Sequence, residues 1–240
     1  MAINSSLYLR LFLPRVGPIF FLPRGGGGPL GGPTPADLSQ PVVRLPHGDP
    51  VLIKQYLEIG VQNLLIPMVD TAEQAAELVR AVRYPPRGIR GMGRGLARSS
   101  RWGRYTDYVR GSDDNVCLLV QIETPTALAN VAEIAAVDGV DGVLMGPADL
   151  AANLGYPEQR THPEVVRAIR HCVRTLRRVG KPAGIMIVDV AAAEEWLREG
   201  ITFAGVGVDS SLLVRAAGDL LARFREHSPA ERSPAAVSAY

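Results

Sequence analysis

The stretch VCLLVQIE, residues 116–123, is an apolar run of strand length that ends in a carboxylate. Residues 124–136 then follow an amphipathic helical pattern, and a second apolar run, VDGVLMG, occupies residues 140–146. Runs rich in Val, Ile and Leu that do not alternate with polar residues are typical of strands buried on both faces. A buried strand, a helix and another buried strand predict a βαβ unit with parallel strands.

The same alternation extends over most of the chain. Further apolar runs lie at residues 41–44, 63–69, 183–188 and 203–208. Further helical patterns lie at residues 71–83, 163–179, 191–199 and 210–224. Asp70 or Thr71 is expected to cap the first of these helices and Asp209 the last, because side-chain oxygens satisfy the free N–H groups of a helix start. Six strands that alternate with helices are therefore predicted.

Two architectures fit this pattern, an open doubly wound sheet and a closed barrel. No Gly-x-Gly-x-x-Gly motif follows the first strand, so a dinucleotide-binding sheet is not supported. Polar residues stand at or just after the strand ends: Arg44, Glu123, Asp149, Asp189 and Asp209. In a barrel those ends form the active-site face. The pattern therefore favours an α/β fold of the TIM (β/α)8-barrel type.

The predicted barrel is incomplete, with about six of its eight βα units recognisable. Residues 1–39 form an atypical segment that is expected to be poorly ordered, since 14–35 alone hold six Pro and seven Gly. One short strand, at 7–13 or at 19–22, is the most that this segment is expected to form. Residues 40–226 are predicted to be the barrel domain, and residues 227–240 a mobile tail.

Composition narrows the class of protein. A formal net charge of +2 from 26 basic and 24 acidic residues gives no reason to expect a nucleic acid or a membrane surface as partner. No apolar run is long enough to span a membrane, and the first residues do not resemble a signal peptide. The two cysteines make no disulfide framework, so we expect a reducing, cytoplasmic location.

Glu123 and Asp149 follow consecutive predicted strands, 26 residues or about one βα unit apart. They are expected on one rim, where two nearby carboxylates repel each other unless a cation or a proton lies between them. Two carboxylates with substrate oxygens and waters suit Mg²⁺ or Mn²⁺. From spacing alone, a simple helix-capping role for both residues is equally favoured.

Two further features of the strand ends fit an anionic substrate. Pro147 at a helix start leaves the N–H groups of Ala148 and Asp149 free for an anion. Arg44, at the end of the strand 41–44, is suited to stabilise a developing enolate oxygen. A surface ion pair explains Arg44 equally well when it is taken alone.

Residues 40–225 resemble the HpcH/HpaI aldolases, the class II (metal-dependent) pyruvate aldolases. The matching sequence motifs include PVVR (41–44), LLIPMV (64–69), RYPPRGIRG (83–91), QIET (121–124) and VDGVLMGPADL (140–150). The nearest likeness is to the 4-hydroxy-2-oxoheptanedioate aldolases, with the sugar-acid aldolases nearby. The match of QIET and GPADL to the aldolases argues against a citrate-lyase β type acting on acyl-CoA thioesters.

The resemblance implies a mechanism and a set of site residues. Glu123 and Asp149 are implied to bind Mg²⁺ or Mn²⁺, with Co²⁺ as a third option. Gln121, with the backbone of Gly146 and Ala148, is implied to hold pyruvate on that metal, and Arg44 to stabilise the metal-bound enolate. Glu58 is implied to be the acidic partner of a catalytic histidine. The implied partners are small 2-oxoacids and further copies of this chain in a homohexamer with exchanged C-terminal helices.

The sequence departs from the family at the catalytic base. The family's Asp-Gly-Glu-His motif is absent, and the nearest substitute for its histidine is His47, in the loop after Arg44. Either residues 1–39 are not the native barrel start, through a frame or start error, or the gene is a remodelled copy. Two functions are therefore carried forward: a lyase that cleaves 4-hydroxy-2-oxoacids and retains oxaloacetate decarboxylation, or a non-catalytic homologue that binds metal and pyruvate at most.

Overall fold

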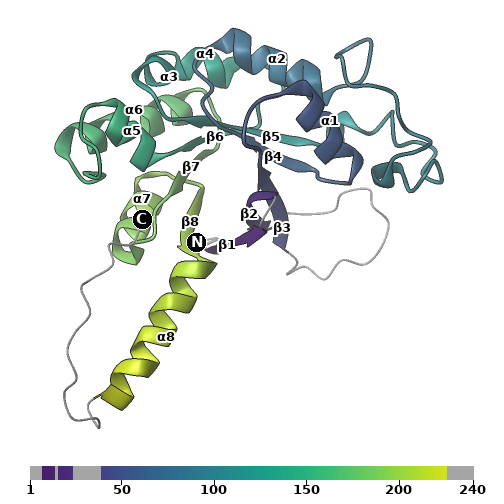
Figure 1. Ribbon diagram of the computed structural model, residues 1–240. Coiled ribbons are helices and arrows are strands. Elements are labelled where there is room, and N and C mark those ends of the chain that lie inside the picture. Colours follow the sequence, from purple (N-terminus) through teal and green to yellow (C-terminus); the bar gives the residue numbers. More distant parts are fainter. Residues whose placement is uncertain (1–6, 14–15, 24–38, 226–240) are drawn as a thin grey trace.

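The computed structural model describes residues 7–13, 16–23 and 39–225 (Figure 1). The strands are β1 (Leu7–Leu13), β2 (Val16–Pro23), β3 (Ser39–Arg44), β4 (Asn63–Ile66), β5 (Cys117–Ile122), β6 (Gly142–Met145), β7 (Ala183–Met186) and β8 (Phe203–Val208). The α-helices are α1 (Pro50–Glu58), α2 (Ala72–Val82), α3 (Pro125–Ala129), α4 (Val131–Ala136), α5 (Pro147–Asn153), α6 (Pro163–Arg178), α7 (Val190–Glu199) and α8 (Asp209–Arg225). Two 3-10 turns, η1 (Arg98–Ser100) and η2 (Asp113–Asn115), lie in the long connection before β5.

Strands β3 to β8 form a curled parallel sheet in chain order, and each is followed by at least one helix. These are six βα units, the number predicted from the apolar runs. In Figure 1 helices α1 to α6 lie on the outer side of this sheet. The curled sheet of β3 to β8 forms a half-barrel. It places the carboxyl ends of all six strands at one end of the molecule, where an active site is expected.

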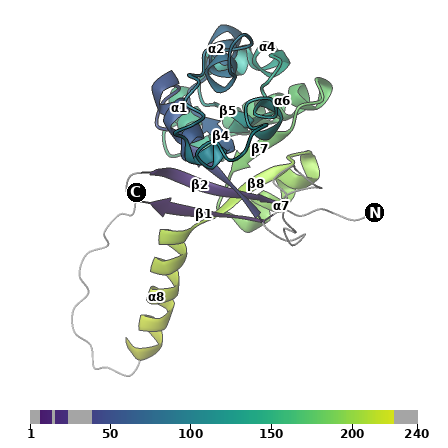
Figure 2. The ribbon, with the colours of Figure 1, turned by 90° about the vertical axis from the view of Figure 1, so that its right-hand side faces the viewer.

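The segment before β3 differs from the prediction. It forms two strands in place of one, and β2 runs antiparallel to both β1 and β3. Because β1 also pairs in parallel with β8, this hairpin closes the ring without contributing a helix (Figure 2). The remainder of the predicted poorly ordered segment lies outside the described residues, as does the predicted tail 227–240.

The core has two layers separated by the sheet. A smaller layer of side chains points into the ring: Val42, Leu65, Leu119 and Leu144, together with Cys117, Met186 and Phe203. A larger layer of buried apolar side chains packs the outer face of the sheet against the helices. Burial raises the pKa of the Cys117 and Cys172 thiols to about 12, so neither is a thiolate at neutral pH.

Local signals explain where the helices begin. Thr71 caps α2 in a reciprocal capping box with Gln74, and Asp189 caps α7. Helix α1, which the sequence patterns did not single out, starts with Asp49 as its cap and Pro50 in its first turn. The predicted helix 124–136 is divided at Asn130 into α3 and α4.

Helix α8 extends away from the rest of the molecule in both views (Figures 1 and 2). Its apolar side chains are exposed, among them Leu213 at 71%, Leu220 at 58% and Phe224 at 67%. Within the described part of the chain, no helix combines the length and the apolar character needed to cross a membrane.

Candidate active site

Glu123 directly follows β5, and its carboxylate is almost completely buried, at 1% exposure. Its Oε2 accepts a hydrogen bond of 3.0 Å from the backbone N–H of Met68. Its Oε1 is buried and has no hydrogen-bond donor among the described residues. A buried carboxylate oxygen without a donor is costly, so this atom marks a place for a proton or a cation.

Asp149 lies in the first turn of α5, which follows β6. The register of β5 and β6 pairs Ile122 with Met145, so the next residues, Glu123 and Gly146, emerge side by side. Burial raises the pKa of Glu123 to about 7, and the negative charge of Asp149 acts in the same direction. The N–H of Met68 and the charge of Arg44 oppose this rise. Glu123 and Asp149 are therefore close enough for the charge of Asp149 to act on Glu123.

Arg44 and Gln121 reach the same place from β3 and β5. The Arg44 Nε donates to Gln121 Oε1 at 3.0 Å, which leaves the Gln121 amide nitrogen directed elsewhere. That nitrogen lies beside Gly146, where an added Cβ would stand 3.0 Å from Gln121 Nε2 and 2.7 Å from Glu123 Oε1. Gly146 thus keeps a space open between the amide and the carboxylate.

The structure brings together six of the seven predicted site residues at the carboxyl ends of the strands. They are Arg44, Gln121, Glu123, Gly146, Ala148 and Asp149, of which Ala148 occupies the exposed first turn of α5. Among the described residues no cluster of three or more His, Cys, Asp or Glu side chains is suited to a metal. Glu123 and Asp149 are the two acidic residues of this group.

Glu58 does not belong to this group. It is the last residue of α1, where the chain has already turned back toward the amino end of β4. Its carboxylate is ion-paired with Lys54 at 2.8 Å and lies against Gly93. In the described structure Glu58 is thus ion-paired within α1 and apart from the other predicted site residues, and its role as partner of a catalytic histidine stays a prediction.

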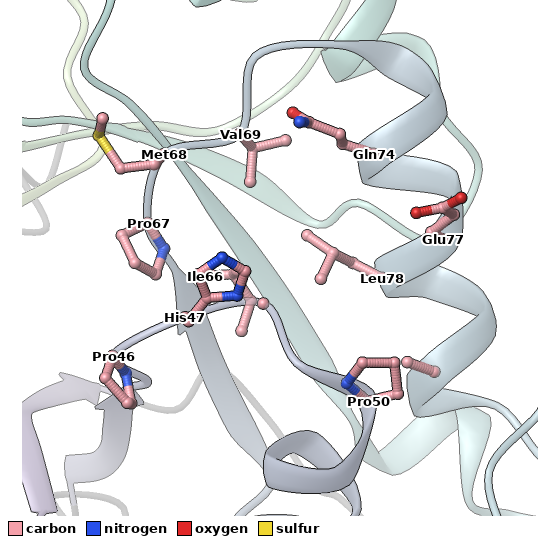
Figure 3. Close-up of a pocket in the computed structure, with 12 residues that line it drawn as sticks. Pro46, His47, Pro50, Ile66, Pro67, Met68, Val69, Gln74, Glu77 and Leu78 are labelled. Atoms are coloured by element: carbon pink, nitrogen blue, oxygen red, sulfur yellow. The ribbon is translucent and has the colours of Figure 1, made fainter.

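His47 lies on the outer side of the rim. It lines a cavity of about 260 Å³ whose opposite wall is α2, with Gln74, Glu77 and Leu78 (Figure 3). In the described structure no hydrogen bond or ion pair joins His47 to Arg44, Gln121 or Glu123. His47 is therefore not supported as a substitute for the missing base.

Two residues that support Glu123 were not predicted. Met68 adopts a left-handed backbone conformation with φ 56°, which is unfavourable for residues other than glycine. No sequence pattern predicts this conformation. The side chain of Asn153 donates to the backbone carbonyl of Glu123 at 3.0 Å. The only signal for Asn153 was its position one helical turn after Asp149.

The fold and these strand ends define the class as an α/β-barrel enzyme with a carboxylate pair at its active end. Comparison with known proteins then identifies the family, since the model for HpcH/HpaI aldolase/citrate lyase matches residues 34–216. The chain belongs to this family. It is accordingly a lyase of the aldolase type, as the resemblance implied.

Individual relatives agree with this assignment. The hydroxypyruvate/pyruvate aldolase of Deinococcus radiodurans is 54% identical over 194 residues, which cover 81% of this chain and 70% of the relative. The 4-hydroxy-2-oxo-heptane-1,7-dioate aldolase of Shigella sonnei is 53% identical over 186 residues, covering 78% and 71%. A family protein of solved structure from Burkholderia cenocepacia superposes with a TM-score of 0.74 at 36% identity, covering 77% and 73%.

Proposed function

We propose that this chain is a metal-dependent carbon–carbon lyase that cleaves 4-hydroxy-2-oxoacids to pyruvate and an aldehyde. The observation that carries the proposal is the buried, donor-free Oε1 of Glu123 beside Asp149, at the end of the barrel where Arg44 and Gln121 also lie. The relatives named as aldolases of hydroxypyruvate, pyruvate and 4-hydroxy-2-oxo-heptanedioate support the substrate class.

Glu123 and Asp149 would hold a divalent ion, Mg²⁺ or Mn²⁺, with Co²⁺ as a third option. The residues fit such an ion, because the donor set is oxygen only, one of those oxygens lacks any donor, and Gly146 leaves the adjoining space open. When bound, the ion supplies Lewis-acid polarisation of the substrate's keto oxygen.

The remaining residues act on the 2-oxoacid itself. Gln121, whose amide N–H₂ is turned toward Gly146 by its bond to Arg44, would hold the substrate together with the backbone of Gly146 and Ala148. The Arg44 guanidinium would stabilise the negative charge that develops on the enolate oxygen of pyruvate. Gln121 also restrains Arg44, so the cation is already oriented before the substrate arrives.

The proton of the 4-hydroxyl group has no evident acceptor, since none of the described histidines joins this group of residues. Aldol cleavage breaks the C3–C4 bond and needs that proton removed, a step in which a general base contributes about 10²–10⁴-fold. Decarboxylation of oxaloacetate makes the same enolate by releasing CO₂ and needs no base. We therefore expect decarboxylation to be the stronger activity.

Pyruvate release tests this order of activities. Purified protein with Mn²⁺ is given oxaloacetate or 4-hydroxy-2-oxoheptanedioate, and the rate with Glu123→Gln at the same total Mn²⁺ is subtracted, since free metal also decarboxylates oxaloacetate. Protein-dependent decarboxylation that exceeds cleavage supports the proposal. Rapid cleavage without decarboxylation contradicts it.

A non-catalytic homologue is the second candidate, favoured by the hairpin that stands where two βα units and the base are expected. Such a protein binds Mn²⁺ and pyruvate without turnover. Its melting temperature would rise with the two ligands, because a ligand that binds only the folded state stabilises it. Ligand stabilisation with no pyruvate release from either substrate would select this alternative.

We also propose that α8 packs against another copy of the chain in a homo-oligomer, with a hexamer expected from the family resemblance. Leu213, Leu220 and Phe224 are exposed on one stripe of the helix, and exposed apolar rows of this size mark interfaces. The double variant Leu213→Glu/Leu220→Glu is expected to lower the mass measured by light scattering, whereas Arg215→Gln on the same helix should not. An unchanged mass in the double variant would exclude this role for α8.

A further inference from the structure

One side-chain amide connects the two elements that carry the carboxylate pair. Asn153 is the last residue of α5, one turn after Asp149. Its Nδ2 donates to the carbonyl oxygen of Asp149 at 3.0 Å and to the carbonyl oxygen of Glu123 at 3.0 Å. The two hydrogens of this amide therefore join the main chains of both residues, although Glu123 lies 30 positions earlier in the sequence.

We propose that Asn153 is a positioning residue that sets the separation of the Glu123 and Asp149 carboxylates. The inference rests on the proposed function, since the two carboxylates are taken to share one divalent ion. A shared ion requires ligand distances within about 0.2 Å of their preferred values. A bond that fixes one ligand's peptide relative to the other ligand's helix supplies that accuracy.

The peptide of Glu123 has need of such a bond. It lies beyond the last ladder residue of β5 and before the first turn of α3, where Thr124 accepts the first helical bond, from Leu128. The neighbouring loops hold the two preceding residues instead: Val69 N–H donates to Gln121 O at 3.3 Å and Gly146 N–H to Ile122 O at 3.2 Å.

Glu123 is consequently held at two points. Met68 N–H fixes Oε2 of the side chain, and Asn153 fixes the carbonyl of the main chain. With both ends restrained, the buried Oε1 has little freedom to turn away from Asp149. Removing the Asn153 amide leaves the side chain attached through Met68 but frees the peptide to rotate.

A plain helix-ending role does not account for the Asn153 side chain. Backbone bonds already close α5, from Leu154 N–H to Leu150 O, from Gly155 N–H to Ala152 O and from Tyr156 N–H to Ala151 O. Gly155 provides the left-handed residue that follows, at φ 88°. The Asn153 side chain is exposed, so its removal leaves the apolar core intact.

The test is the dissociation constant of Mn²⁺, measured without substrate from the electron paramagnetic resonance of the free ion. Asn153→Ala is expected to raise this constant about tenfold or more, the usual effect of losing a residue that orients a metal ligand. Asn153→Gln, which keeps the amide on a longer chain, should recover part of the affinity. The matched control is Asn63→Ala, because Asn63 also donates from Nδ2 to a backbone carbonyl, that of Pro41 at 2.9 Å, at the amino end of β4.

The outcomes separate the possibilities. Weaker Mn²⁺ binding by Asn153→Ala, with a metal-free melting temperature no lower than that of Asn63→Ala, supports the proposal. An unchanged dissociation constant overturns it, and so does a protein that fails to fold, because Asn153 would then serve the fold as a whole. If the unaltered protein binds no Mn²⁺, the proposed function itself fails, which the metal titration of that protein reveals first.

Discussion

Replacement of Glu123 by Gln is expected to abolish stabilisation by Mn²⁺ while making the metal-free protein more stable at pH 8. Burial raises the pKa of Glu123 to about 7, from an ordinary value of 4.5. The folded state therefore holds this proton more tightly than the unfolded state does. Its contribution to stability is present in full below pH 4.5 and is lost as the pH rises to about 7. At pH 8 the loss is roughly 3 kcal/mol, which the neutral Gln side chain avoids.

Denaturant unfolding of the metal-free protein at pH 5 and pH 8 measures this difference. The fall in unfolding free energy between these two values should be smaller for Glu123→Gln than for the unaltered protein. Glu133→Gln, an exposed residue of α4, is the control and should follow the unaltered protein. Equal pH dependence in all three proteins would show that Glu123 is not the buried group responsible.

Metal binding follows from the same pKa. A divalent ion has to displace the proton from Glu123, so the apparent Mn²⁺ affinity of the unaltered protein should rise up to about tenfold per pH unit below pH 7 and level off above it. Glu123→Gln removes the charge and with it the affinity, together with protein-dependent pyruvate release. Retention of Mn²⁺ stabilisation by this variant would remove Glu123 from the set of metal ligands.

A single methyl group at Gly146 is expected to lower pyruvate release at least a hundredfold. The Cβ would lie 2.7 Å from Glu123 Oε1 and 2.9 Å from Glu123 Cγ, closer than real Cβ contacts allow, and 3.0 Å from Gln121 Nε2, which is tighter than most real Cβ contacts. Both side chains would have to move, and both are proposed to hold the ion or the substrate. The backbone is not the cause, because Gly146 has φ −102°, which Ala adopts without strain.

Gly95→Ala is the matched control, since a Cβ at Gly95 meets nothing within 4 Å. Overpacking at Gly146 costs about 1–3 kcal/mol, so thermal melting should accompany the assay to show that the variant is folded. A folded Gly146→Ala protein with normal pyruvate release would show that the space beside Glu123 and Gln121 is not used by the reaction.

The strand ends were the part of the site that local sequence could predict. An apolar run long enough for a buried strand shows where the strand stops, and parallel strands all stop at one end of the fold. Glu123 and Asp149 could therefore be placed together before the structure was known. Arg44 followed in the same way, whereas Gln121 was assigned through the family resemblance, and the hydrogen bond between them places both side chains together.

Other features of the fold and the site depend on contacts between residues far apart in the sequence, which local patterns do not predict. Glu58 was assigned through the family resemblance as the partner of a catalytic histidine, and the motif that carries this histidine is absent from the sequence. Helix α1 places Glu58 away from the strand ends. The hairpin of β1 and β2 depends on pairing with β8, almost two hundred residues later. The left-handed Met68 and the bridging Asn153 depend on where Glu123 lies.

Six βα units, their parallel order and the two carboxylates at neighbouring strand ends could be predicted from local patterns, because hydrophobic periodicity and strand length are properties of contiguous residues. Which carboxylate oxygens of Glu123 receive a hydrogen bond depends instead on long-range contacts. Oε2 of Glu123 takes the Met68 N–H, Oε1 is left without a donor, and Asn153 ties the peptide to the helix of Asp149. These contacts join residues 30 and 55 positions apart, and their geometry follows from the packing of whole elements.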